Sequence, residues 1–201
     1  LLKRLEDAIN CGDKIYGIIR GIGLANDIGG SLLAPYTEGQ LRAMRDAYAQ
    51  AGWQPTEVQL IECHGTGTPT GDAVELKSIK ELMGTIYPED YECVIGSVKS
   101  NVGHLLTGAG AAGLMKLILA LKNSKLPGVA NFRSADPALE LDKTPIRILT
   151  ESKVWERPFE GISRKCALSA FGFGGIDGHV LLEEYIASTH SLTAGHPVLR
   201  R

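Results

Sequence analysis

The amino-acid sequence predicts a layered α/β domain built on a mixed, largely parallel β-sheet. Strand-like and helix-like apolar patterns alternate between residues 15 and 122, as they do when helices cover a sheet between successive parallel strands. The short strand-like runs beyond residue 127 follow one another closely and predict antiparallel additions to this sheet. With 44% hydrophobic residues among 201, the chain has enough apolar content for a sizeable core.

The first predicted strand covers residues 15–23 and leads into a loop that ends near residue 36. Thr37 and Gln40 have the spacing of a capping box, in which side chains satisfy the free backbone amides at the start of a helix. An apolar stripe at helical spacing follows, and Gly52 predicts the end of this helix.

The second predicted strand, residues 58–63, delivers His64 at its C-terminal end. A glycine-rich loop follows, and Asp72 with Glu75 has the spacing of a second capping box that opens the next helix. Residues 93–97 predict the third strand.

A helix that is apolar nearly all round is predicted from His104 to Lys122, and such a helix belongs inside a larger body. Three glycines lie in its first turns, and each costs about 1 kcal/mol relative to alanine in a helix interior. We therefore expect another backbone to approach closely there. The helix dipole would keep His104 neutral, and a neutral imidazole can donate a hydrogen bond to a developing oxyanion.

Composition excludes several classes of partner. The formal net charge of -2 does not suit nucleic acid or an anionic membrane, and no apolar run approaches the about 18 residues of a membrane span. No secretory leader is evident, so we expect a cytoplasmic protein. The chain starts without an initiator methionine and resembles mid-domain sequence, so we expect a piece of a longer polypeptide. Free buried thiols, not disulfides, are expected for Cys11, Cys63, Cys93 and Cys166.

Polar, glycine-rich loops follow three of the predicted strands. The first carries His64, the second carries Lys99 and His104, and the third is Gly172–Gly175. Because loops at the carboxyl ends of strands converge on one crevice of an α/β sheet, we expect both histidines and the lysine to meet there.

Other chemistries fit this crevice less well. The loop after His64 lacks the Gly-Lys-Ser/Thr of a phosphate-binding P-loop, and no Gly-x-Ser-x-Gly elbow of a serine hydrolase is present. A zinc site of Cys63, His64, Cys93 and His104 would lack the close paired spacing of usual ligands, and no metal is expected. Cys63 would point away from His64, into the core, because neighbours on a strand face opposite sides.

Three stretches of the chain resemble the β-ketoacyl synthases, specifically the ketosynthase domains of modular polyketide synthases. They are residues 61–72 (IECHGTGTPTGD), residues 99–104 (KSNVGH) with the Ala/Gly-rich helix that follows, and residues 169–175 (SAFGFGG). The resemblance covers residues 1–185. These residues are similar to the C-terminal half of such a domain, and residues 1–24 among them are similar to the last elements of its N-terminal half. Residues 186–201 are predicted to be a tail or linker.

The resemblance implies a thiolase-like fold, which has αβαβα layers when complete and is usually a homodimer. It implies decarboxylative Claisen condensation of an acyl thioester with a malonyl-type unit carried on the phosphopantetheine of an acyl carrier protein, with no cofactor bound directly. His64 and His104 match the two histidines that donate hydrogen bonds to the malonyl thioester carbonyl, and Lys99 matches the lysine that tunes them. The substrate-binding positions that the resemblance implies are Thr66, Thr68, Phe171, Phe173 and Gly174, with Phe173 as a gate.

This chain departs from the family in two ways. The nucleophilic cysteine lies in an Asp-Thr-Ala-Cys-Ser-Ser type elbow in the first half of the family's domain, and no such stretch occurs here. We therefore expect a partner N-terminal half that supplies it. Asp177 stands where the family usually has asparagine, and His179 is expected to be structural, at the start of the last strand.

Two alternatives to condensation remain. One is a truncated, non-catalytic half that acts as a scaffold or dimerisation partner. The other is simple decarboxylation or thioester hydrolysis by the two histidines.

Overall fold

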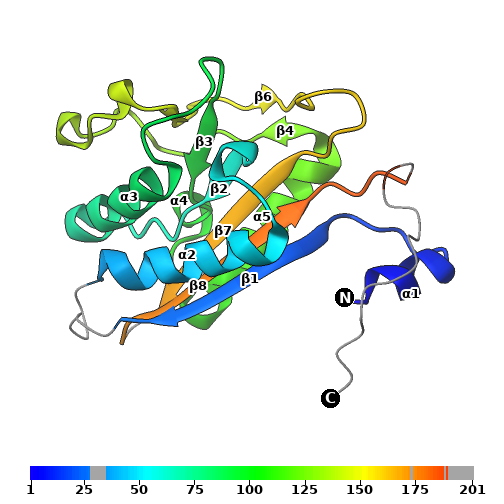
Figure 1. The fold of residues 1–201 in the computed structure, drawn as a ribbon. Coiled ribbons are helices and arrows are strands. Elements are labelled where there is room, and N and C mark those ends of the chain that lie inside the picture. The colour runs from blue at the N-terminus through cyan, green and yellow to red at the C-terminus, as the bar shows by residue number, and fades with distance from the viewer. Residues whose placement is uncertain (28–34, 173, 188, 190–201) are drawn as a thin grey trace.

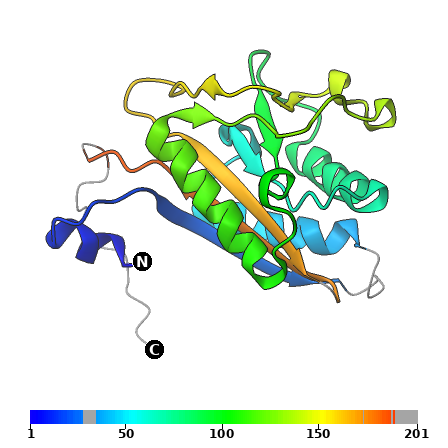
Figure 2. The same ribbon diagram turned by 180° about the vertical axis from the view of Figure 1, so that it is seen from behind.

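The computed structural model describes residues 1–27, 35–172, 174–187 and 189. Its centre is a six-stranded sheet with the order β1-β8-β7-β2-β3-β5 (Figure 1). Helices α2 and α3 cover one face of this sheet, and α5 covers the other, as the opposite view in Figure 2 shows. Most of the predicted tail, residues 188 and 190–201, and residues 28–34 of the predicted loop lie outside the described residues.

The sheet is parallel from β7 to the β5 edge and antiparallel on the side of β8 and β1. β7 pairs with β2, β2 with β3 and β3 with β5 in parallel, whereas β8 runs antiparallel to both β1 and β7. This confirms the predicted α/β class with a mixed, largely parallel sheet. The strands are β1 (Ile18–Asn26), β2 (Leu60–Glu62), β3 (Cys93–Gly96), β5 (Ile146–Arg147), β7 (Lys165–Gly172) and β8 (Ile176–Glu183), with a separate pair β4 (Lys125–Leu126) and β6 (Lys153–Val154).

Helices connect the parallel strands and flank the sheet. The α-helices are α1 (Leu5–Asn10), α2 (Thr37–Ala51), α3 (Pro69–Met83), α4 (Lys99–Val102) and α5 (Ala109–Asn123). The 3₁₀ turns are η1 (Pro55–Glu57), η2 (Leu106–Gly108), η3 (Pro137–Leu139) and η4 (Leu141–Lys143). No helix in the described part of the chain is both long and apolar enough to cross a membrane.

A hydrophobic core lies on each face of the sheet. Ile61 packs toward α2 and α3 with Met44 and Ile79, whereas its neighbour Leu60 packs toward α5 with Leu117. Alternate side chains of β2 therefore serve opposite layers, as the two-residue period of a strand requires. This double burial explains why the strand sequences are continuous apolar runs.

Strand β1 lies directly against α2. A β carbon at Gly21 would overlap the carbonyl oxygen of Ala47, and one at Gly23 would overlap that of Ala43. Only glycine allows the helix backbone to approach this closely. The edge strand and the helix are thereby held together by direct backbone contact.

Both predicted capping boxes are wrong. The residue before α2 is Tyr36, which makes no side-chain cap, and the buried Gln40 accepts a hydrogen bond from the hydroxyl of Ser78 on α3 at 2.7 Å. Helix α3 is capped by Thr68, whose hydroxyl oxygen accepts from the Gly71 amide at 3.2 Å. The predicted helix end at Gly52 is confirmed by its left-handed conformation. Gln40 and Glu75 have the spacing of caps but are buried in tertiary contacts, which a local pattern does not reveal.

The predicted central helix is shorter than expected, because α5 begins at Ala109 and not at His104. Gly103 has φ of 73° and Leu106 has φ of 51°, and both values break a right-handed helix. The close approach at Gly113 is also different from expectation: a β carbon there would lie 2.7 Å from Leu168 Cδ1 and 3.0 Å from Glu62 Cγ, which are side-chain atoms.

The cysteines are free thiols, as predicted, but they are not all buried. Cys63, Cys93 and Cys166 lie in the core, whereas Cys11 is exposed at the end of α1. α1 is short and buries only Ala8, so its end remains in solvent.

Candidate active site

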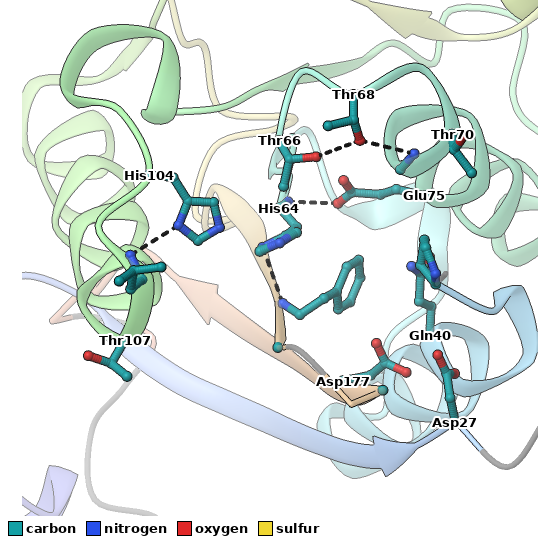
Figure 3. Close-up of a pocket in the computed structure, with 16 residues that line it drawn as sticks. Asp27, Gln40, His64, Thr66, Thr68, Thr70, Glu75, His104, Thr107 and Asp177 are labelled. Atoms are coloured by element: carbon teal, nitrogen blue, oxygen red, sulfur yellow. Dashed lines mark hydrogen bonds between the residues drawn. The ribbon is translucent and has the colours of Figure 1, made fainter. Parts of the chain in front are cut away.

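The carboxyl ends of β7, β2 and β3 bring the predicted site residues together. His64 follows β2, His104 follows β3 and α4, and Phe171 lies near the end of β7. The imidazole centroids are 5.5 Å apart with an interplanar angle of 81°, and the Phe171 ring lies 5.4 Å from that of His64. Both histidines and Phe171 line one cavity of about 730 Å³. Figure 3 shows the two imidazoles at this cavity. The structure therefore brings the two histidines together, as the sequence predicts.

The backbone fixes the tautomer of each histidine. The Phe171 amide donates to His64 Nδ1 at 3.3 Å, and the Leu106 amide donates to His104 Nδ1 at 3.0 Å. In a neutral imidazole whose Nδ1 accepts a hydrogen bond, the proton is on Nε2. Each ring is thus left with one Nε2–H donor for a ligand.

His64 is held in the neutral form. Burial lowers its pKa to about 4, and the positive charge of Lys99 acts in the same direction. Burial also lowers the pKa of Lys99, while the carboxylates of Glu62 and Glu75 counteract it. Lys99 is half-buried and is not among the described residues that line the cavity, so it acts on His64 through its charge.

His104 occupies a different position from the one predicted. It lies five residues before α5, with α4 on one side and η2 on the other, so the dipole of the long helix does not begin at its ring. Its orientation is instead set by the turn that follows, in which the Leu106 amide reaches back to the imidazole.

A buried carboxylate holds the backbone beside His64. The two oxygens of Glu75 accept from the amides of His64, at 2.7 Å, and of Gly65, at 2.8 Å. Burial raises the pKa of Glu75 to about 7, although these two amides favour the charged form. Gly65 has φ of 43°, and a β carbon there would lie 2.8 Å from Ser97 Cβ, so only glycine fits between the two loops.

The predicted substrate-binding residues occupy different places around the cavity. Thr66 and Thr68 line it, and their hydroxyl oxygens are 3.0 Å apart. Phe171 lines it as well, next to His64. Gly174 is exposed and is not among the described residues that line the cavity. Phe173 lies outside the described residues.

A pair of carboxyl groups lies in the cavity wall across from the histidines (Figure 3). Asp177 is 2% exposed. Its Oδ2 atom and the Oδ1 atom of Asp27 have no hydrogen-bond partner among the described residues. Both oxygens lie over Gly39, where a β carbon would be 2.5 Å from Asp177 Oδ2. Burial and the Asp27 charge raise the pKa of Asp177 to about 7. The repulsion between the two carboxyl groups thus favours the neutral, protonated form of Asp177.

His179 is structural, but it lies within β8 and not at its start. Its ring is buried, stacks on Tyr48 at 5.8 Å and has Nδ1 3.1 Å from the Ser169 hydroxyl. Burial lowers its pKa to about 3, so it is a neutral core residue.

The described residues contain no group of three or more His, Cys, Asp or Glu side chains that could hold a metal ion. Cys63 and Cys93 lie in the hydrophobic core, and burial raises the pKa of both thiols. What the site offers is two imidazoles whose Nδ1 atoms accept from backbone amides and whose Nε2–H groups can donate, which suits stabilisation of an oxyanion.

Sequence reasoning missed the acidic residues of the site. The local pattern predicts helix caps at Gln40 and Glu75, and it predicts no role for Glu62 or Asp27. Their partners are remote in sequence, so the available signal was indirect: a carboxylate inside an apolar strand, as in Glu62, is buried and must have a partner.

Comparisons with known proteins agree with this geometry. The family model of the β-ketoacyl synthase C-terminal domain matches residues 16–133. One of the phenolphthiocerol/phthiocerol polyketide synthase proteins of Mycobacterium tuberculosis is 39% identical over 207 residues, which cover 99% of this chain and 14% of that protein. A polyunsaturated fatty acid synthase protein of Thraustochytrium sp. is 43% identical over 192 residues, which cover 92% of this chain and 7% of that protein.

Solved structures give the same result. The ketosynthase from module 6 of the bacillaene synthase from Bacillus subtilis 168 superposes with a TM-score of 0.87 and 37% sequence identity, covering 92% of this chain and 33% of that one. This chain therefore has the thiolase-like fold, and it spans only a small part of its relatives. It belongs to the β-ketoacyl synthase family, as the C-terminal half of a ketosynthase domain of the modular polyketide synthase type.

Proposed function

We propose that this chain contributes the decarboxylation and enolate-stabilising part of a ketosynthase that performs decarboxylative Claisen condensation. One observation carries the proposal: two imidazoles 5.5 Å apart line one cavity, and each has its Nδ1 occupied by a backbone amide. Two Nε2–H donors are then available to one carbonyl oxygen. Neutral donors of this kind stabilise an oxyanion as its charge develops.

In the proposed reaction, the thioester carbonyl oxygen of a malonyl-type substrate accepts hydrogen bonds from His64 and His104. The bond between the α carbon and the carboxylate breaks, carbon dioxide leaves, and the electron pair forms an enolate whose oxygen the two imidazoles stabilise. The enolate carbon then bonds to the acyl carbon of a cysteine thioester, and the cysteine leaves as thiolate. Burial keeps His64 neutral, and the positive charge of Lys99 acts in the same direction.

The cysteine must come from a partner N-terminal half. Burial raises the pKa of Cys63, Cys93 and Cys166, and Cys11 is not among the described residues that line the cavity. The face of α5 turned away from the sheet is apolar and open, with Met115 55% exposed, and it offers a surface for that half. The bacillaene ketosynthase is about three times as long as its matched part, which supports the need for such a half.

The substrate is proposed to arrive on the phosphopantetheine arm of an acyl carrier protein, within a homodimer. Thr66 and Thr68 lie at the cavity wall with hydroxyls suited to hydrogen bonds with the amides of that arm. Thr68 also caps α3, so its hydroxyl is already oriented.

Release of carbon dioxide from malonyl–acyl carrier protein tests the proposal, measured on the polypeptide as its natural source makes it. His64→Ala and His104→Ala should each lower the rate about 10²–10³-fold, the usual effect of removing one oxyanion donor. Glutamine at either position keeps a neutral N–H donor and should restore part of the rate. A scaffold would release no carbon dioxide, and decarboxylation without a ketoacyl product would favour the simple decarboxylase.

A further inference from the structure

Glu62, two residues before His64, joins three parts of the fold. It is the last residue of β2 and is 1% exposed. Its Oε2 accepts from Lys116 Nζ of α5 at 2.6 Å, and its Oε1 accepts from the Val98 amide at 2.5 Å. One carboxylate thus ties the end of β2 to α5 and to the segment that follows β3.

Two glycines make room for this arrangement. A β carbon at Gly113 of α5 would lie 3.0 Å from Glu62 Cγ, and one at Gly96 of β3 would lie 3.4 Å from Lys116 Nζ. Gly113 costs helix stability relative to alanine, and the space that it leaves is filled by the Glu62 and Leu168 side chains. Both α5 and β3 therefore have a glycine where the ion pair needs space.

The ion pair is a poor source of stability by itself. Burial raises the pKa of Glu62, while Lys116 and the Val98 amide oppose this change. Replacing a buried ion pair by apolar side chains of similar size is often neutral or stabilising, because both charges lose their hydration. The contact to the Val98 amide is different, since a buried amide without an acceptor is costly.

Val98 directly precedes Lys99, the first residue of α4. We propose that Glu62, held by Lys116, is a positioning residue: its contact to the Val98 amide fixes the start of α4 and thereby places Lys99 beside His64. The inference rests on the function proposed above for the histidines. It adds a residue that touches neither substrate nor imidazole and acts through the backbone.

Two double variants separate this contact from the charges. Glu62→Gln with Lys116→Met removes both charges but keeps a carbonyl oxygen that can accept from the Val98 amide. Glu62→Leu with Lys116→Met removes both charges and the acceptor. Because electrostatic changes are the same in both, any difference between them reports the contact to Val98, and thermal unfolding of each variant shows that it is folded.

The first readout is kcat and KM for carbon dioxide release. The leucine variant should lose about tenfold to a hundredfold in kcat, the effect of a small misplacement, with KM nearly unchanged, and the glutamine variant should stay close to the unaltered protein. Equal rates in the two double variants would overturn the proposal.

The second readout is the pKa of His64, followed by NMR on the same protein. Because the Lys99 charge lowers this pKa, Lys99→Met should raise it in the glutamine background. In the leucine background, where Lys99 is displaced, the same substitution should change it little. An equal change in both backgrounds would also overturn the proposal. If the unaltered protein releases no carbon dioxide, the proposed function fails, and the titration still decides whether Glu62 positions Lys99.

Discussion

Replacing Asp177 by asparagine should flatten the dependence of stability on pH. Asp177 is 2% exposed and faces the Asp27 carboxyl over Gly39, and burial together with the Asp27 charge raises its pKa to about 7. In the unfolded chain its pKa returns to about 3.9. Between pH 4 and 7 the folded protein therefore binds more protons than the unfolded chain. The free energy of unfolding falls as pH rises through this window and levels off above it.

The magnitude follows from the size of the shift. A change from the ordinary value of 3.8 to about 7 corresponds to about 4 kcal/mol at 1.36 kcal/mol per unit. The pair borders the cavity and Asp27 is half-buried, so water screens part of this, and we expect about 2 kcal/mol. Asparagine cannot ionise, and its amide can donate to the Asp27 carboxylate. Asp177→Asn should thus be more stable by about 2 kcal/mol above pH 7 and equally stable near pH 4.

Urea unfolding at pH values between 4.5 and 8.5 measures this difference. Glu75 also has a raised pKa, so the unaltered protein and the variant are compared at each pH, and the difference between them is the observable. Asp142→Asn is the matched control, because Asp142 is exposed and its loss should leave the pH slope unchanged. Parallel stability curves for Asp177→Asn and the unaltered protein would refute the reasoning.

Three further predictions concern the site and its supports. Because burial lowers the pKa of His64 to about 4, protonation of His64 should not reduce the rate of carbon dioxide release between pH 5.5 and 8. A rate that follows a titration of His64 near pH 6.5, measured by NMR, would contradict this. Glu75→Gln keeps one acceptor where two amides donate, so it should lower the decarboxylation rate about tenfold or more while the protein stays folded by circular dichroism. Gly113→Ala should lower the free energy of unfolding by about 1–3 kcal/mol, because the added methyl group would lie 2.7 Å from Leu168 Cδ1. Gly110→Ala is the control and should be tolerated, because its β carbon would lie 3.4 Å from Ala170 Cβ.

Local sequence patterns located the strands and the loops that carry the histidines. His64 could be placed because it directly follows an apolar strand, and the carboxyl ends of neighbouring parallel strands meet at one edge of the sheet. The same reasoning placed His104 near it. It failed on the helix that follows, where the positive φ of Gly103 separates His104 from α5. A glycine directly before His104 was the local signal for that break.

What the sequence determined by itself is the α/β class, the convergence of the two histidines and the family motifs, because these follow from short-range periodicity and from residues adjacent in the chain. The tertiary structure alone decided the roles of the buried carboxylates. Glu75 and Gln40 have the spacing of helix caps, yet they bind the backbone of another element and a side chain of another helix. Asp27 and Asp177 meet only because β1 pairs with β8. A buried polar group takes whatever partner the fold brings within reach, and that partner has no fixed separation along the chain.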